Sequence, residues 1–286
     1  MVPALLLYAS LVNDVRSLIA RHDLAAADRM VETYKAKAGA TSEVAAAESW
    51  LARAALDGQN YQQAERYAAR SRALSDALLR THKLDADSWL PTAVGAAIEV
   101  HAQALARQGE REQAVSYLRG QLALFTGASI EERIRKNLNL LSLEGKPAPR
   151  LIGGPAFGGH PVLLFFWAHW CPDCKAEAPI LADLLRIYGP KGLLLIGPTR
   201  LYGYVAGGQD ASPEVEKRYI EEVRRQYYAP LASMPAPLSA ANFQAYGAST
   251  TPTLVLVDAQ GIVRLYHPGG MSEAELAARI EALPQP

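Results

Sequence analysis

Residues 163–179 read LLFFWAHWCPDCKAEAP, and this stretch contains both cysteines of a chain of 286 residues. The apolar run at its start is typical of a buried strand, and the pattern that follows is typical of a helix. Cys171 therefore lies at a strand-to-helix junction, where unpaired backbone N–H groups and the helix dipole favour a thiolate. Cys174 lies one turn further on, close enough to form a disulfide. The spacing predicts that Cys171 attacks and Cys174 resolves.

Two other uses of the cysteine pair fit the sequence less well. A structural metal site needs four ligands, and there is no second Cys pair or His pair to complete one. A purely structural disulfide would close a very short loop, for which the entropic stabilisation is smallest. We therefore expect redox chemistry at the Cys171–Cys174 pair, without a metal and without a separate cofactor.

Composition limits the classes of partner. Lys plus Arg and Asp plus Glu both number 29, so the formal net charge is zero. The chain therefore has no overall positive charge that would attract it to nucleic acid or to an anionic membrane. No apolar run approaches the roughly 20 residues that a membrane-spanning helix needs. The expectation is a small-molecule or protein substrate, no nucleic acid and no spanning segment.

The sequence pattern changes at a Pro and Gly cluster in residues 141–161, which predicts two domains, residues 1–145 and 146–286. Before the cluster, apolar residues recur at helical spacing between polar breaks at residues 39–42, 57–60, 107–110 and 126–129. Residues 104–124 resemble a tetratricopeptide unit, with Gly109 in the turn and Ala114 and Leu118 placed for close packing. The resemblance extends over roughly residues 10–143, although the spacing between units is irregular. An ordinary alanine-rich helical bundle is the alternative, and no catalytic cluster stands out in this half.

After the cluster, the periodicity predicts an α/β layer with a mixed sheet. The expected elements are a strand at 161–167, a helix at 171–189, a strand at 191–199, a helix at 212–228, a short helix at 242–247, a hairpin at 251–268 and a last helix at 269–283. Ser212 and Pro213 begin one helix, and Ser272 with Glu275 forms a capping box for another. A Gln260–Gly261 turn joins the two strands of the hairpin.

Two stretches, FFWAHWCPDCKAEAP at 165–179 and TTPTLVLVDAQGIV at 250–263, carry a resemblance to a known family. They resemble the thioredoxin fold, and in particular the bacterial extracytoplasmic thiol-disulfide oxidoreductases of the TlpA and ResA kind. The resemblance covers about residues 147–286. It implies a thioredoxin-like mixed sheet with flanking helices, preceded here by an all-α, repeat-like domain, and an enzyme that exchanges disulfides with protein thiols.

The resemblance also implies roles for particular residues. Cys171 is the nucleophile, Cys174 is the resolving thiol, and the Thr251–Pro252 peptide is cis and faces the cysteines. Substrate contacts are assigned to a set that surrounds the pair: Trp170, Pro172, Thr251 and Pro252.

One departure from cytoplasmic thioredoxins concerns the group that handles protons. Those proteins carry a buried aspartate where this chain has Phe165, whereas the TlpA and ResA kind places a glutamate in the helix, where this chain has Glu177. Helical phase puts Glu177 on the same apolar stripe as Cys174. We expect Glu177 to be a buried proton acceptor with a raised pKa. In the alternative, a kink at Pro179 turns it to the rim, where it pairs with a basic residue.

Further expectations concern the surroundings of the cysteines. We expect His169 to be a solvated residue at the edge of a loop, and the carboxylate of Asp173 to oppose a thiolate on Cys171. Residues 200–220 enlarge the connection after the second strand and are rich in Gly and Tyr. This segment either borders the cysteine site and shapes substrate choice or packs on the helical domain.

Two rival functions remain open. Thiol peroxidases of the redoxin (AhpC/TSA) type need a Thr or Ser three residues before the reactive cysteine and a Pro four residues further back, but this chain has Ala168 and Leu164 there. A non-catalytic scaffold is the other rival, in which the helical domain binds a protein partner. In the favoured interpretation, the helical domain helps to select the partner of an active oxidoreductase.

The family resemblance favours an extracytoplasmic location, periplasmic or at the cell envelope, with a signal or lipid segment trimmed or lost before residue 1. A cytoplasmic location is the alternative. Residues 1–12 are either a remnant of such a signal or, as we slightly favour, the first turns of a docked helix.

Overall fold

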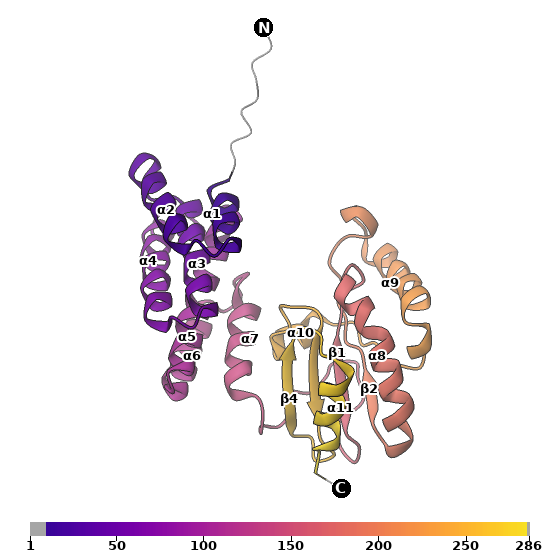
Figure 1. Ribbon diagram of the computed structural model, residues 1–286. Helices are drawn as coiled ribbons and strands as arrows, with labels where there is room; N and C mark the ends of the chain where they lie inside the picture. The colour runs from indigo at the N-terminus through magenta and orange to yellow at the C-terminus, as the bar shows by residue number, and fades with distance from the viewer. Residues whose placement is uncertain (1–9, 285–286) are drawn as a thin grey trace. The chain divides into compact units, whose positions relative to one another are not determined.

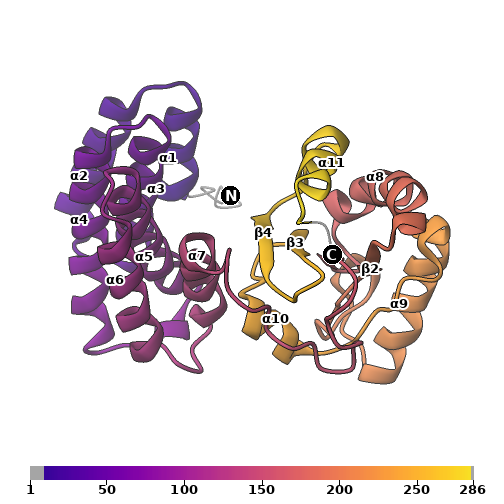
Figure 2. The same cartoon turned by 90° about the horizontal axis from the view of Figure 1, so that it is seen from below.

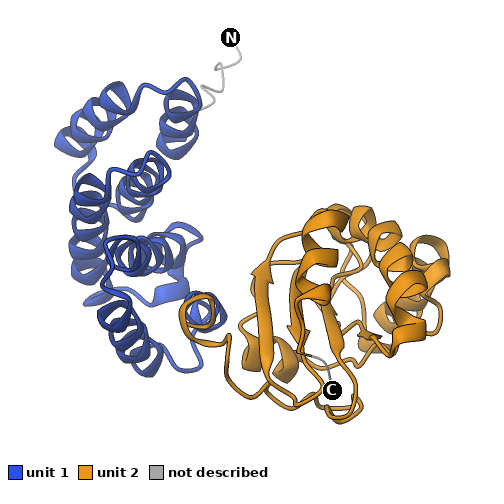
Figure 3. Cartoon of the chain, turned by 60° about the horizontal axis from the view of Figure 1, so that its bottom comes forward, with its two compact units in different colours: residues 1–137 blue, residues 138–286 orange. Residues whose placement is uncertain are grey.

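A computed structural model describes residues 10–284 of the chain, which divides into two compact units, residues 1–137 and 138–286 (Figure 3). The division falls inside helix α7 (Glu131–Ser142), whereas the sequence places the boundary after residue 145, within the Pro and Gly cluster. Most of the segment at 1–12, for which a helix or a signal remnant is expected, lies outside the described residues. Helix α1 begins at Leu11.

The first unit is all-helical over its described residues, as predicted (Figure 1). Its helices before α7 are α1 (Leu11–Ala20), α2 (Leu24–Ala38), α3 (Ser42–Asp57), α4 (Tyr61–Leu79), α5 (Trp89–Arg107) and α6 (Arg111–Leu124). Each predicted polar break lies between two helices. Thr41 and Asn60, in two of these breaks, cap the next helix by accepting the backbone N–H of Val44 and Gln63.

The core of this unit is built largely from small side chains, because α3 and α5 carry many alanines on their inner faces. Ala114 and Leu118 of α6 are fully buried, as the sequence predicts. The likeness to tetratricopeptide units stays a prediction. In the described part of the chain, no helix combines the length and the apolar character that are needed to cross a bilayer.

The second unit contains a mixed four-stranded sheet, which confirms the predicted fold class. Its strands are β1 (Val162–Phe166), β2 (Leu194–Ile196), β3 (Thr253–Val257) and β4 (Val263–Pro268), in the order β2-β1-β3-β4. β1 pairs parallel with β2 and antiparallel with β3, which forms a hairpin with β4. Gly261 takes a positive φ of 81° at the predicted turn of this hairpin.

Both faces of the sheet are covered, which explains why β1 is apolar at every position. Leu163 and Phe165 face a core that includes side chains of α8 (Pro172–Tyr188), α9 (Pro213–Tyr227) and α11 (Glu273–Glu281). Leu164 and Phe166 face a second core that is closed by α10 (Ala240–Tyr246). Figure 2 shows α8 and α11 on the opposite side of the sheet from α10.

Most of the predicted element ends are confirmed. α8 ends before Gly189, Ser212 caps α9 with Pro213 in its first turn, and Ser272 and Glu275 form the capping box of α11. The second strand is shorter than predicted. After β2, the N–H groups of Gly197 and Thr199 donate to carbonyls of residues 235 and 237, so this part of the chain bonds a loop instead of a strand.

Candidate active site

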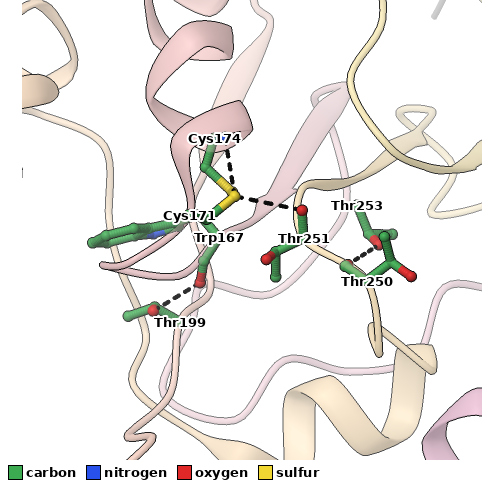
Figure 4. The surroundings of a disulfide bond; sticks show 7 residues. All are labelled: Trp167, Cys171, Cys174, Thr199, Thr250, Thr251 and Thr253. Carbon is green, nitrogen blue, oxygen red and sulfur yellow. Dashed lines mark hydrogen bonds between the residues drawn. A yellow bond between two sulfur atoms is a disulfide. The ribbon is translucent and has the colours of Figure 1, made fainter. Parts of the chain in front are cut away.

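The two cysteines lie at the junction between β1 and α8, and they form a disulfide (Figure 4). Cys171 is the N-cap of α8 in an extended backbone conformation, and Pro172 occupies the first helical position. Only 1% of the Cys171 surface and none of the Cys174 surface is exposed. The sulfur of Cys171 is therefore covered almost completely by the residues that surround it.

The start of α8 favours negative charge on Cys171. The backbone N–H of Cys174 donates a hydrogen bond to Cys171 Sγ over 3.0 Å. An N–H at the first turn of a helix has no partner within the helix, so a sulfur at this place receives both a hydrogen bond and the favourable end of the helix dipole. Asp173 is exposed, so water screens its carboxylate.

A second segment borders the site at the start of β3, which lies beside the end of β1 in the sheet. The Thr251–Pro252 peptide is cis, as the family resemblance implies, and the carbonyl oxygen of Thr251 lies 3.4 Å from Cys171 Sγ. The hydroxyl of Thr253 donates to the carbonyl of Thr250 over 2.7 Å and ties the ends of this turn together (Figure 4). Backbone groups before β3 are thus held against the reactive sulfur.

The rim of the site is formed by residues next to the cysteines. Trp170 is 45% exposed, Pro172 is also exposed, and Thr251 is half-buried. Pro252, the next residue, is buried. The residues that the sequence assigns to substrate contact therefore surround Cys171, and their role stays a prediction.

Glu177 lies on α8, one turn after Cys174, and only 5% of its surface is exposed. This excludes the alternative in which Pro179 turns it to the rim. Burial raises the pKa of Glu177, and a hydrogen bond from the backbone N–H of Met271 to Oε1, 3.2 Å long, opposes the rise. The structure thus provides a buried carboxylate on the same helix as Cys174, one turn further along.

The expectation for His169 is wrong. Its side chain is fully buried, and Nε2 lies 3.0 Å from Oε1 of Glu216, which is also fully buried. The rings of Tyr202, Tyr204 and Tyr219 pack around the imidazole. These partners come from the segment at 200–220 and the start of α9, so that segment borders the residues next to the cysteines.

Sequence reasoning missed Glu216, although a signal for it was present. The inward face of α9 carries Ile220 and Val223, and Glu216 lies four residues before the first of them, on the same stripe. Helical phase, which identified Glu177 as a buried carboxylate, identifies Glu216 in the same way.

Comparisons with known proteins agree with this geometry. A family model described as a thioredoxin-like domain matches residues 157–284. The thiol:disulfide interchange protein DsbE of Xylella fastidiosa strain Temecula1 is 29% identical over 143 residues, which cover 46% of this chain and 64% of that protein. The thiol-disulfide oxidoreductase ResA of Oceanobacillus iheyensis is 47% identical over 38 residues, 13% of this chain and 20% of that protein.

Among solved structures, a secreted Mycobacterium tuberculosis disulfide oxidoreductase described as homologous to DsbE of E. coli aligns with a TM-score of 0.33 and 23% identity. The alignment covers 44% of this chain and 84% of that one. The chain spans less than two thirds of the length of the DsbE relative from Xylella fastidiosa. From the matched family model and the sheet that carries the cysteine pair, residues 157–284 of this chain are a thioredoxin-like domain.

Proposed function

We propose that the protein is a thiol-disulfide oxidoreductase that exchanges the Cys171–Cys174 pair with a protein partner. The observation that carries the proposal is the position of the disulfide, capped by the first turn of α8 and faced by the Thr251 carbonyl. The redox centre is the cysteine pair itself, and no further cofactor is proposed.

The exchange takes place in two steps. In the reduced protein, the Cys171 thiolate attacks a substrate disulfide, so that a Cys171–substrate disulfide forms and the other substrate sulfur leaves as a thiolate. Cys174 then loses its proton and attacks Cys171 Sγ, which releases the second substrate thiolate and forms the Cys171–Cys174 disulfide. Two electrons have passed to the substrate, and the reverse sequence oxidises a substrate dithiol.

Each residue around the pair has a task in this sequence. The N–H of Cys174 stabilises the attacking thiolate, and Glu177 accepts the Cys174 proton in the second step. The backbone before β3, at Thr251 and Pro252, lines one side of the path to Cys171, while Trp170 and Pro172 line the other. The substrate cysteine is presented between these two sides.

Reduction of insulin by dithiothreitol tests the proposal. The protein is expected to accelerate the precipitation of reduced insulin, because Cys171 attacks the insulin disulfides faster than the small dithiol does. The control is the same mixture without protein. A rate equal to that control would contradict the proposal and favour the scaffold.

The peroxidase alternative receives no support from the surroundings of Cys171. Ala168 and Leu164 occupy the positions at which peroxidases need a hydroxyl and a proline, and both are fully buried apolar residues. No hydroxyl is therefore offered there to orient a peroxide.

We assign partner selection in part to the helical unit, which exposes the large apolar side chain of Leu124 at 72%. The partner is a protein that bears a reactive thiol or disulfide. Covalent capture of the partner at Cys171 is the experiment that identifies it.

We infer that the protein acts outside the cytoplasm, at the cell envelope. The inference is supported by the likeness of residues 165–179 and 250–263 to extracytoplasmic bacterial oxidoreductases. Fractionation of the native host is expected to place the protein in the envelope fraction. Recovery in the cytosolic fraction alone would overturn the inference.

A further inference from the structure

The carboxylate of Glu216 is an anchoring point beside the cysteine site. It is fully buried in the first turns of α9 and accepts N–H groups from other parts of the chain. Oε1 accepts the backbone N–H of Tyr202 over 2.6 Å and lies 3.0 Å from His169 Nε2, while Oε2 accepts the backbone N–H of Gly203 over 2.8 Å. One side chain thus ties the segment at 200–220 to the residue that precedes Trp170.

The protonation state of His169 follows from these contacts. Burial lowers the pKa of His169, and the hydrogen bond with Glu216 opposes the shift. A carboxylate only accepts hydrogen bonds, so Nε2 carries the proton of the neutral ring. Nδ1 is buried and has no hydrogen-bond partner among residues 10–284. The imidazole is therefore held in place by Glu216 and by the rings around it.

Those rings connect the anchor to the surface. Tyr202 meets the His169 ring edge to face, with centroids 5.6 Å apart. The same Tyr202 ring meets Trp170 edge to face at 5.5 Å, so it bridges the buried histidine and the exposed tryptophan. Edge-to-face packing has a defined geometry, and the orientation of Trp170 therefore depends on where Glu216 holds Tyr202.

The Trp170–Tyr202 pair lies where a partner arrives. Cys171 is 1% exposed, so an incoming protein contacts the rim before it reaches the sulfur. Trp170 follows His169 directly and precedes Cys171, and with 45% of its surface exposed it offers an apolar face there. An aromatic or long apolar side chain is the group that such a face holds best.

We propose that Glu216 is a positioning residue that acts through His169 and Tyr202. It orients the Trp170–Tyr202 pair as a selectivity surface. This surface binds an aromatic or apolar side chain adjacent to the reacting cysteine of a protein substrate. The proposal rests on the proposed exchange function. It assigns to Glu216 and Tyr202 the choice of substrate, and it leaves the chemistry at Cys171 unchanged.

The test compares three disulfide substrates of the full-length reduced protein. Two are cysteine peptides joined to the same small thiol by a disulfide, identical except for Phe or Ser next to the cysteine. The third is bis(2-hydroxyethyl) disulfide, which is too small to contact the rim. kcat and KM are measured for the wild type and for two variants, Tyr202→Ala and Glu216→Gln.

The variants act on different parts of the arrangement. Tyr202→Ala removes the ring but leaves the backbone N–H groups on Glu216. Glu216→Gln places an NH₂ group where two backbone donors and an imidazole require acceptors. The matched controls are Glu221→Gln, on the exposed side of the same helix, and Tyr34→Ala, an exposed tyrosine of the helical unit.

The wild type is expected to favour the Phe peptide over the Ser peptide by about threefold to tenfold in kcat/KM, mainly through KM. Both variants are expected to bring this ratio close to one, with unchanged turnover of bis(2-hydroxyethyl) disulfide, while both controls keep the wild-type ratio. A ratio near one in the wild type, or an unchanged ratio in Tyr202→Ala or in folded Glu216→Gln, would overturn the inference. Tyr202→Ala decides alone if Glu216→Gln does not fold. A wild type that fails to reduce bis(2-hydroxyethyl) disulfide would contradict the exchange function itself.

Discussion

Reduced Cys174→Ser protein is expected to accumulate a covalent mixed disulfide with its partner, whereas Cys171→Ser accumulates none and exchanges disulfides at the background rate. Cys171 is the sulfur that the N–H of Cys174 stabilises at the start of α8, so its removal abolishes attack. Serine at position 174 keeps the backbone N–H and the helix cap. It lacks the thiol that releases the partner, and the first intermediate therefore persists.

Both variants are mixed with a lysate of the native host, and adducts are separated on non-reducing gels and identified by mass. The Cys171→Ser variant is the matched control, because it keeps a thiol in the same motif. Adducts on Cys171→Ser that equal those on Cys174→Ser would show that either sulfur attacks, against the assigned roles. The mass of the captured protein names the partner, which neither the motif nor the fold identifies.

Glu177→Gln is expected to slow the release of the mixed disulfide by about 10²-fold near neutral pH, because general base assistance of this kind contributes at least that much. The first attack by Cys171 does not involve Glu177 and should keep its rate. Burial raises the pKa of Glu177, and only the ionised carboxylate accepts a proton. The wild-type release rate should therefore rise with pH as Glu177 ionises, and the variant should lack this rise.

Stopped-flow measurement across pH separates the two steps. The difference between the proteins should shrink at high pH, because an unassisted thiol ionises on its own near pH ~8.5. Asp183→Asn removes an exposed carboxylate from the same helix and serves as control. Equal release rates in the wild type and Glu177→Gln across this range would remove Glu177 from the mechanism.

The same substitution has an expected effect on stability, and its sign follows from the pKa. The folded protein binds the Glu177 proton more tightly than the unfolded chain, so the wild type loses stability as pH rises from the ordinary value of 4.5 through the raised one. Glutamine does not titrate. The free energy of unfolding of oxidised Glu177→Gln, measured with denaturant, should exceed that of the wild type at neutral pH and match it most closely in acid.

Much of the domain follows from short-range sequence patterns. The apolar run before Cys171 predicts β1, and Ser272 with Glu275 predicts the start of α11, because each signal lies within the element it defines. Glu177 is found by helical phase, since its burial depends on the face of one helix. Local patterns do not predict where β2 ends, because the residues after it form hydrogen bonds with a distant segment, residues 235–238.

His169 shows where the sequence misleads. Next to a Cys-x-x-Cys motif in a loop, a histidine is an ordinary polar residue, and the hydrogen-bond partner that holds its ring does not lie within ten positions of it. Its partner Glu216 lies 47 residues further along the chain, and the tyrosines around it come from the same distant segment. A contact over that separation is fixed by the tertiary fold, which no local pattern encodes.

Gly270 adds a constraint of a different kind. A methyl group at this position would lie 2.5 Å from Glu177 Oε2. The φ angle of Gly270 is outside the left-handed region that favours glycine, so the restriction on a side chain there is one of space. Any side chain at position 270 therefore moves the carboxylate of Glu177. In a directed-evolution experiment we expect substitutions at 270 and 177 to co-vary, and under the role proposed for Glu177 a substitution at 270 would alter proton transfer without changing a charged residue.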